Sequence, residues 1–162
     1  MNPIFLITGG TGRLGRALAA EFHDALIPAH TELELTSTSS VRKFLSRTVP
    51  DIVIHTAAFT DVRSAEARRE YCWKLNVDGT ERIVEGLLCY SPSCYFVHIS
   101  SPCVFRGDTV NYTESSIPGP SNFYGLGAAH IQSSRLELSR MRKNSIGIEP
   151  STIKLSCFHN TT

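Results

Sequence analysis

The sequence predicts an α/β protein of the Rossmann type, a doubly wound parallel sheet with helices on both faces. Three observations predict it: short apolar runs alternate with helical patterns, a glycine-rich turn follows the first run, and several runs contain almost no polar residue. Strands that are apolar throughout are typical of parallel sheets, because helices cover both of their faces. With 162 residues, the chain has the length of one domain, and we expect residues 1–162 to form a single domain.

The N-terminal elements follow from the spacing of apolar residues. The run Ile4–Thr8 is apolar and is ended by glycines, which predicts a short buried strand. Leu14, Leu18 and Phe22 lie four residues apart and predict one face of a helix of about ten residues. Two weaker strands are expected next in the chain, at Ala25–Pro28 and Glu32–Leu35.

The next helix is marked by apolar residues at Val41, Phe44 and Leu45. A hydroxyl side chain before this stripe can cap the helix, and Pro50 stops it. The candidate caps are Thr38, Ser39 and Ser40. The remaining strands are expected at Asp51–Ala57, Tyr95–Ile99 and Thr152–Leu155.

Two further helices are expected in the second half of the chain. An apolar stripe between Trp73 and Leu88 predicts a long helix, and Ile131, Leu138 and Met141 predict another. Residues 101–122 contain prolines and serines together with scattered apolar side chains, so they predict an ordered loop rather than a linker. His55 and His98 fall within predicted buried strands, and we expect them to be core residues with satisfied hydrogen bonds rather than ligands.

The composition is that of a globular protein without a charged binding surface. Apolar residues make up 41% and charged residues 19%, with a formal net charge of +1. This balance gives no indication of nucleic-acid or membrane binding. The five cysteines form no Cys-x-x-Cys pair, so neither a disulfide framework nor a metal site is predicted. No apolar run near the start is long enough for a signal sequence or a membrane span, and we expect a cytoplasmic protein.

The turn after the first strand has the spacing of a phosphate-binding loop. Gly9, Gly12 and Gly15 lie three residues apart between the predicted strand and the predicted helix. Glycines there permit a tight turn, a close approach of the backbone to a pyrophosphate, and close packing of helix on strand. The free N–H groups of the following helix then face the phosphates. The turn therefore predicts a dinucleotide site.

The choice of cofactor depends on the end of the weak second strand. An acidic residue there would hold the ribose 2′-hydroxyl of NAD, but the chain has no acid before Glu32. Arg13 and His30 are candidates to meet a 2′-phosphate, which favours NADP(H) over NAD(H). The alternative that both are solvated surface residues stays open.

Six motifs in order resemble the extended short-chain dehydrogenase/reductases of the dTDP-4-dehydrorhamnose reductase type. They are TGGTGRLG (8–15), LELT (33–36), PDIVIHTAAFTDVRSAE (50–66), LNVDGT (75–80), ISSPCVF (99–105) and YTESSIPGPSNFYG (112–125). The regulatory β subunit of methionine adenosyltransferase, a relative that is not a reductase, is similar to the same pattern. The resemblance implies dinucleotide binding and 4-keto reduction of a nucleotide sugar.

The resemblance also implies roles for individual residues. It places Tyr124 as the catalytic tyrosine and Ser101 as the residue that holds the substrate carbonyl. The residues that it places along the cofactor are Gly9, Thr11, Gly12, Arg13, Leu14 and Gly15 at the pyrophosphate, Glu34 and Leu35 near the adenine, and Ala57, Ala58 and Thr60 under the nicotinamide-side ribose.

The chain departs from the family pattern at the active site and in length. The family has Tyr-x-x-x-Lys, whereas this chain has alanine at the lysine position, Ala128. Losing a positioned charge of this kind costs on the order of 10²–10³ in rate. Family members also continue beyond the last predicted strand, so the part that completes the substrate pocket is expected to be missing. We therefore expect a weak or inactive reductase. The alternative is a non-catalytic dinucleotide-binding regulatory or partner subunit. The last strand is expected to present an unpaired edge, through which a protein partner or a second copy of the chain could associate.

Overall fold

The computed structural model describes residues 2–109, 111–113, 115–145 and 153–156, and from residue 135 onward it describes the course of the backbone alone. Its centre is a four-stranded parallel sheet, in the order β1-β2-β3-β4. The strands are β1 (Phe5–Thr8), β2 (Ile52–His55), β3 (Tyr95–Ile99) and β4 (Ile153–Ser156). The predicted Rossmann-type parallel sheet is confirmed.

The predicted strand at Ala25–Pro28 is reduced to a single bridge. Leu26 pairs with Leu6 in parallel, with bonds from Leu26 N to Phe5 O (2.7 Å) and from Ile7 N to Leu26 O (2.9 Å). These bonds use the edge of β1 opposite to β2. The segment that follows β1 therefore pairs on one side of β1, and β2 pairs on the other side. The carboxyl end of β1 is therefore the point where the winding reverses, which is where α/β sheets bind ligands.

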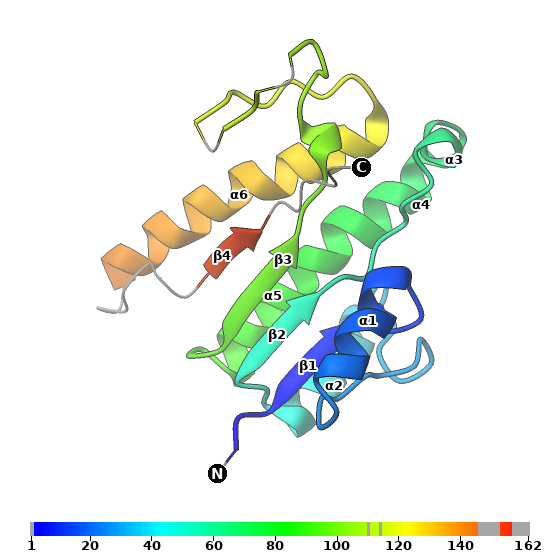
Figure 1. Ribbon diagram of the computed structural model, residues 1–162. Helices are drawn as coiled ribbons and strands as arrows, with labels where there is room; N and C mark the ends of the chain where they lie inside the picture. The colour runs from blue at the N-terminus through cyan, green and yellow to red at the C-terminus, as the bar shows by residue number, and fades with distance from the viewer. Residues whose placement is uncertain (1, 110, 114, 146–152, 157–162) are drawn as a thin grey trace.

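Helices cover both faces of the sheet (Figure 1). Helix α1 (Arg13–Glu21) packs on β1 in front of the sheet, whereas α2 (Thr38–Thr48) and α5 (Gly79–Tyr90) pack against each other behind it. The core lies between the sheet and these two rear helices, and includes Leu6, Val41, Leu45, Val53, Ile83, Leu87 and Phe96.

The segments between β2 and α5 differ from the single long helix that the sequence predicts. Helix α3 (Val62–Ala67), which was not expected, begins at the cap Asp61 and is followed by α4 (Arg69–Trp73). A π-helix, η1 (Lys74–Asp78), then joins α4 to α5. The rest of the chain forms a short 3₁₀ turn, η2 (Pro102–Val104), and helix α6 (Phe123–Ser145), which packs against α3, α4 and η1.

Two smaller predictions were wrong, and others fall on residues that the structure does not describe. Residues 32–35 form turns rather than a strand, although Leu33 and Leu35 are buried. The cap of α2 is Ser37, whose side chain accepts a bond from Ser40 N, and not residues 38–40. Thr152 and the side chains of Leu138 and Met141 lie outside the described residues. In the described part of the chain, no helix has the length and apolar character that a membrane span needs.

Candidate dinucleotide site

A cleft of about 540 Å³ opens where β1, β2 and β3 end. This is within the range of about 300–1,000 Å³ that is usual for ligand sites. Several segments form it: the turns after β1 and β2, the segment before α2, the π-helix η1, the end of β3 and the start of α6. Its lining includes Gly9, Thr11, Gly12, Arg13, Leu14, Gly15, His30, Leu35, Ala57, Ala58, Thr60, Ser101 and Tyr124.

The glycine turn is packed so closely that side chains are excluded. Gly9 has a φ of 75°, and a Cβ there would lie 2.6 Å from Ala57 N. A Cβ on Gly15 would lie 2.1 Å from Gly9 O. Gly12 occupies the N-cap of α1 without any side-chain cap, so the first N–H groups of this helix are left for a ligand. The turn therefore has the cradle that a pyrophosphate needs.

Leu14, which the resemblance places at the pyrophosphate, lies at the start of α1. Its side chain is 37% exposed and lines the cleft, while Gly15 is the buried residue of α1. The reason is that the close contact at Gly15, rather than a leucine stripe, brings the start of α1 onto the turn.

Tyr124 and Ser101 meet at the inner end of the cleft. Tyr124 lies in the first turn of α6. The backbone of this turn packs tightly on residue 103, since a Cβ on Gly125 would lie only 2.0 Å from Cys103 O. Burial raises the pKa of the Tyr124 phenol, and a hydrogen bond with Ser101 partly offsets this rise. The phenol is therefore protonated at neutral pH and can act as a proton donor.

A second, smaller cavity of about 30 Å³ adjoins Tyr124. Ala128, one helical turn further along α6, lines it together with Asn76, Ser100 and Ser101. The Ser100 hydroxyl oxygen is buried there without a hydrogen-bond partner. Among the described residues, His98 is the one basic side chain that lines this smaller cavity.

His30, which lines the cleft, is in close contact with Glu34. The Nδ1 atom of His30 lies 2.9 Å from Glu34 Oε2. Glu34 Oε1 accepts bonds from Thr36 N (2.9 Å) and Thr36 Oγ1 (2.8 Å). These bonds and the nearby His30 outweigh partial burial and hold the pKa of the Glu34 carboxyl below its usual value. Of the residues named as site residues from the sequence, Glu34 alone is absent from the cleft lining, and it acts on His30 instead.

A buried polar chain under the cleft connects its loops. His55 is 1% exposed, with Thr8 Oγ1 at 2.7 Å from Nδ1 and Thr80 Oγ1 at 3.1 Å from Nε2. The Thr80 hydroxyl donates its proton to Asn76 O (2.6 Å), so it must accept from His55 Nε2–H, and Nδ1 must accept from Thr8. His55 is thus a neutral, satisfied core residue, as predicted. Asn76 in turn bonds both N and O of Phe59, which fixes the turn after β2.

This arrangement makes the stability of the protein dependent on His55 staying neutral. Burial, and secondarily the nearby His98, lowers the pKa of His55 to about 3. Its unfolded value is near 6.5, so this contribution is complete above about pH 6.5 and is lost as the pH falls toward 3. We expect His55 to make the free energy of unfolding fall by about 1.4 kcal/mol per pH unit within this window. Urea unfolding at pH 7, 6 and 5 measures this slope.

The matched variant is His55→Asn, which lacks a titrating ring. The carboxylates that also titrate on acidification are common to both proteins, so the difference in slope isolates His55. Equal slopes in the two proteins between pH 6.5 and 5 would contradict the assignment.

Comparison with known proteins decides the family. Residues 3–135 match the family model described as the RmlD substrate binding domain. The chain belongs to the RmlD family. It is 30% identical over 140 residues to dTDP-4-dehydrorhamnose reductase of Aggregatibacter actinomycetemcomitans, covering 83% of this chain and 47% of that protein. It is also 30% identical over 131 residues to methionine adenosyltransferase 2 subunit beta of Xenopus tropicalis, covering 74% of this chain and 39% of the relative.

Solved structures of the RmlD family agree with the fold. The crystal structure of dTDP-4-dehydrorhamnose reductase from Bacillus anthracis in complex with NADP superposes with a TM-score of 0.79 at 30% identity. The match covers 85% of this chain and 50% of that one. The chain therefore spans half or less of the length of these relatives.

Sequence reasoning missed part of the cleft wall in this RmlD-family chain. Leu33 and Leu75 line the cleft, and both are also members of the buried core. Nothing in the sequence separates them from ordinary core leucines, because they carry no polar group and belong to no glycine motif. Ser100, by contrast, had a signal, since it directly precedes Ser101 at the end of a predicted strand.

Proposed function

We propose that this chain binds a nicotinamide dinucleotide, NADP(H) in preference to NAD(H), as a dTDP-4-dehydrorhamnose reductase-like protein. The observation that carries the proposal is one continuous cleft, with a glycine cradle and uncapped helix at one place and the Ser101–Tyr124 pair at another. A dinucleotide needs both a phosphate cradle and room for the nicotinamide beside reacting groups. The NADP complex of the Bacillus anthracis relative supports the choice of ligand.

Different groups of residues would contact different parts of the dinucleotide. The backbone of residues 9–15 would hold the pyrophosphate, and Leu35, with Glu34 behind it, would lie near the adenine. Ala57, Ala58 and Thr60, all on the turn after β2, would lie under the nicotinamide-side ribose. Asn76 fixes the turn after β2 through its bonds to Phe59, which favours binding because little order must be gained there.

The preference for NADP(H) rests on Arg13 and His30. Both line the cleft beside the glycine turn, where a 2′-phosphate could reach them. Within the described part of the chain, Arg13 forms no ion pair with a carboxylate, whereas His30 already contacts Glu34. Arg13 is therefore the residue we expect to contribute most to the discrimination between the two cofactors.

The chemistry that we propose is reduction of a keto group on a nucleotide sugar. The reduced dinucleotide supplies the hydride when it is bound. Ser101 would donate a hydrogen bond to the substrate carbonyl, and the Tyr124 phenol would donate a proton to the same oxygen. Because Ala128 leaves the resulting phenolate without a neighbouring cation, we expect turnover to be slow.

A second candidate function is favoured by Ala128 itself. A chain that binds the dinucleotide without efficient turnover would suit a partner subunit, and one set of relatives is named as the beta subunit of methionine adenosyltransferase 2. A protein partner, or a second copy of the chain, could pair with the outer strand β4 of the described sheet.

The thiols Cys72, Cys89 and Cys103 fit a cytoplasmic location, where cysteines stay reduced.

Calorimetric titration with NADPH and NADH tests the proposal. We expect NADPH to bind more tightly than about 10 μM, and NADH more weakly. Arg13→Gln should weaken NADPH binding and leave NADH binding unchanged, because only NADPH carries the 2′-phosphate. Absence of binding by either dinucleotide would refute both candidate functions. Equal effects of Arg13→Gln on the two ligands would refute the preference for NADP(H).

A further inference from the structure

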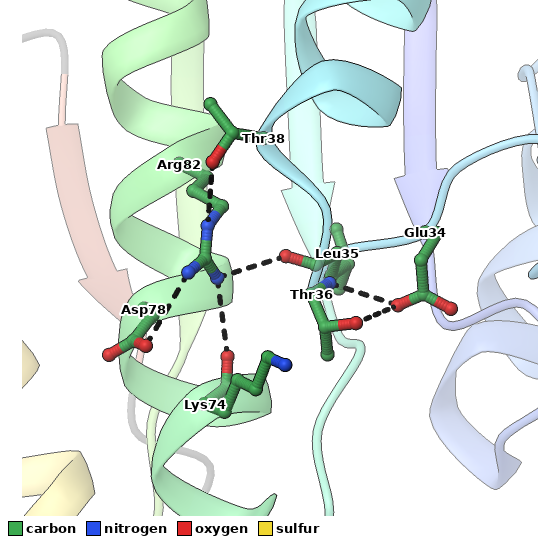
Figure 2. A network of polar contacts seen from close by, with 7 residues as sticks. All are labelled: Glu34, Leu35, Thr36, Thr38, Lys74, Asp78 and Arg82. Carbon is green, nitrogen blue, oxygen red and sulfur yellow. Dashed lines mark hydrogen bonds and ion pairs between the residues drawn. The ribbon is translucent and has the colours of Figure 1, made fainter.

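Arg82, at the start of α5, joins three segments that the candidate site needs (Figure 2). Its Nε donates to Thr38 Oγ1 (3.2 Å), and Nη1 donates to both Leu35 O (3.3 Å) and Lys74 O (3.4 Å). Its Nη2 lies 3.5 Å from Asp78 Oδ2. The Arg82 side chain is 20% exposed, and its contacts with Leu35 O and Asp78 are partly buried.

The two carbonyls that share Nη1 belong to different backbone segments that reach the cleft wall. Leu35 lines the cleft from the turn before α2, and Leu75, the residue after Lys74, lines it from the π-helix. Both leucines are at most 9% exposed. One nitrogen atom of Arg82 therefore bridges the two backbone segments that carry these leucines.

The neighbourhood leaves little freedom to either segment. A Cβ on Gly79 would lie 3.3 Å from Leu35 Cβ, so the turn sits close on the first residue of α5. On its other side the turn is held by Glu34, which accepts from Thr36, and by Ser40 Oγ, which accepts from Glu34 N (3.0 Å). Figure 2 shows Arg82 and Glu34 on opposite sides of this turn. The cleft wall at Leu35 is thus braced from both sides.

We infer that Arg82 is a positioning residue for the adenine end of the dinucleotide site, acting through Leu35 and Leu75 without touching the ligand. This inference rests on the proposed function. The planar guanidinium suits the task because it donates in several fixed directions at once. A lysine ammonium is a compact donor on a flexible stem and cannot span the same four oxygens with one geometry.

The test compares Arg82→Lys with the matched variant Arg47→Lys, which makes the same change near the end of α2. For Arg82→Lys we expect the Kd values of NADPH and of adenosine 2′,5′-bisphosphate both to rise by roughly tenfold. The fluorescence of the reduced nicotinamide at saturating NADPH should stay as in the wild type, because the change is confined to the other end. Arg47→Lys should change neither quantity.

Several outcomes would overturn the inference. Unchanged Kd values would show that Arg82 does not position the wall, and an altered nicotinamide emission at saturation would indicate general loosening of the fold. Thr38→Val, which removes a single acceptor, provides a milder variant should Arg82→Lys fold poorly, and it should raise the same two Kd values by a smaller factor. If the wild type binds no dinucleotide, the proposed function fails first, a result distinct from the failure of Arg82 alone.

Discussion

Replacing Ala128 with lysine is expected to raise the rate of keto-sugar reduction by about 10²–10³. Ala128 and Tyr124 lie one helical turn apart on α6 and line the same small cavity. An ammonium group there would stabilise the phenolate that forms when Tyr124 gives up its proton. It should also lower the pKa of Tyr124, which burial now raises. Steady-state oxidation of NADPH with a dTDP-4-keto sugar measures the rate, and ultraviolet titration of the phenol measures the pKa.

The control for this gain is Leu126→Lys. Leu126 lies on the same helix turn but is 47% exposed and lines neither cavity, so a lysine there adds the same charge in water. It should change neither the rate nor the Tyr124 pKa. The gain should disappear when Tyr124→Phe is combined with Ala128→Lys. A lowered pKa without any gain in rate would indicate that the substrate side of the cleft, rather than the missing cation, limits the reaction.

Gly15→Ala is expected to cause the largest loss. The added Cβ would lie 2.1 Å from Gly9 O and 2.8 Å from Gly10 Cα, which are backbone atoms that no side-chain rotation can clear. Overpacking of this kind destabilises a protein by about 1–3 kcal/mol. Because the turn itself must shift, we also expect NADPH affinity to fall by at least about tenfold, or 1.4 kcal/mol. Urea unfolding and calorimetric titration measure the two effects.

The matched change is Gly119→Ala, where the nearest atom to an added Cβ is Arg106 Nε at 4.0 Å. This variant should retain wild-type stability and affinity to within experimental error. If Gly15→Ala binds NADPH as the wild type does, the glycine turn is not the phosphate cradle.

The buried parallel strands could be predicted well because their signal is local. Tyr95–Ile99 has the predicted bounds, and β1 and β2 lie within the predicted runs. Continuous apolar residues between turn residues allow few other structures in a chain of this length. The run at Ala25–Pro28 did not become a full strand, since Pro28 has no N–H to donate to a ladder.

The π-helix could not be predicted, because its cause lies elsewhere in the chain. Apolar spacing cannot reveal one widened turn within a long stripe. Here the turn is accompanied by side-chain contacts that the apolar pattern does not show: Asn76 binds the backbone of Phe59 in the turn after β2, and Arg82 of α5 binds the carbonyl of Lys74. Helix α3 was missed for a different reason, since it has six residues and a single buried one, Ala65. Its cap, Asp61, was the available signal.

The candidate site shows the same difference between features with a local sequence signal and features that depend on tertiary contacts. Residues in glycine and tyrosine motifs were found from the sequence, and the cleft brings nearly all of them together. The supporting residues, Arg82 and the His55 chain, were not found as such. Their importance depends on which backbone groups they meet, and this is determined by tertiary structure alone.

The parallel pairing of the sheet has a consequence for how the protein acquires its site during synthesis. Phe5 pairs with Ile52, and Ile52 pairs with Tyr95, so each neighbouring strand must wait for more than forty further residues. Such non-local pairing slows folding, because the entropy cost of closing a long loop comes before the stabilising contacts between the strands can form. The glycine turn lies within the first fifteen residues, but it can pack on Ala57 only after β2 has been made, and the cleft is complete only after Tyr124 has been made. The nascent chain therefore carries the binding motif long before it can bind.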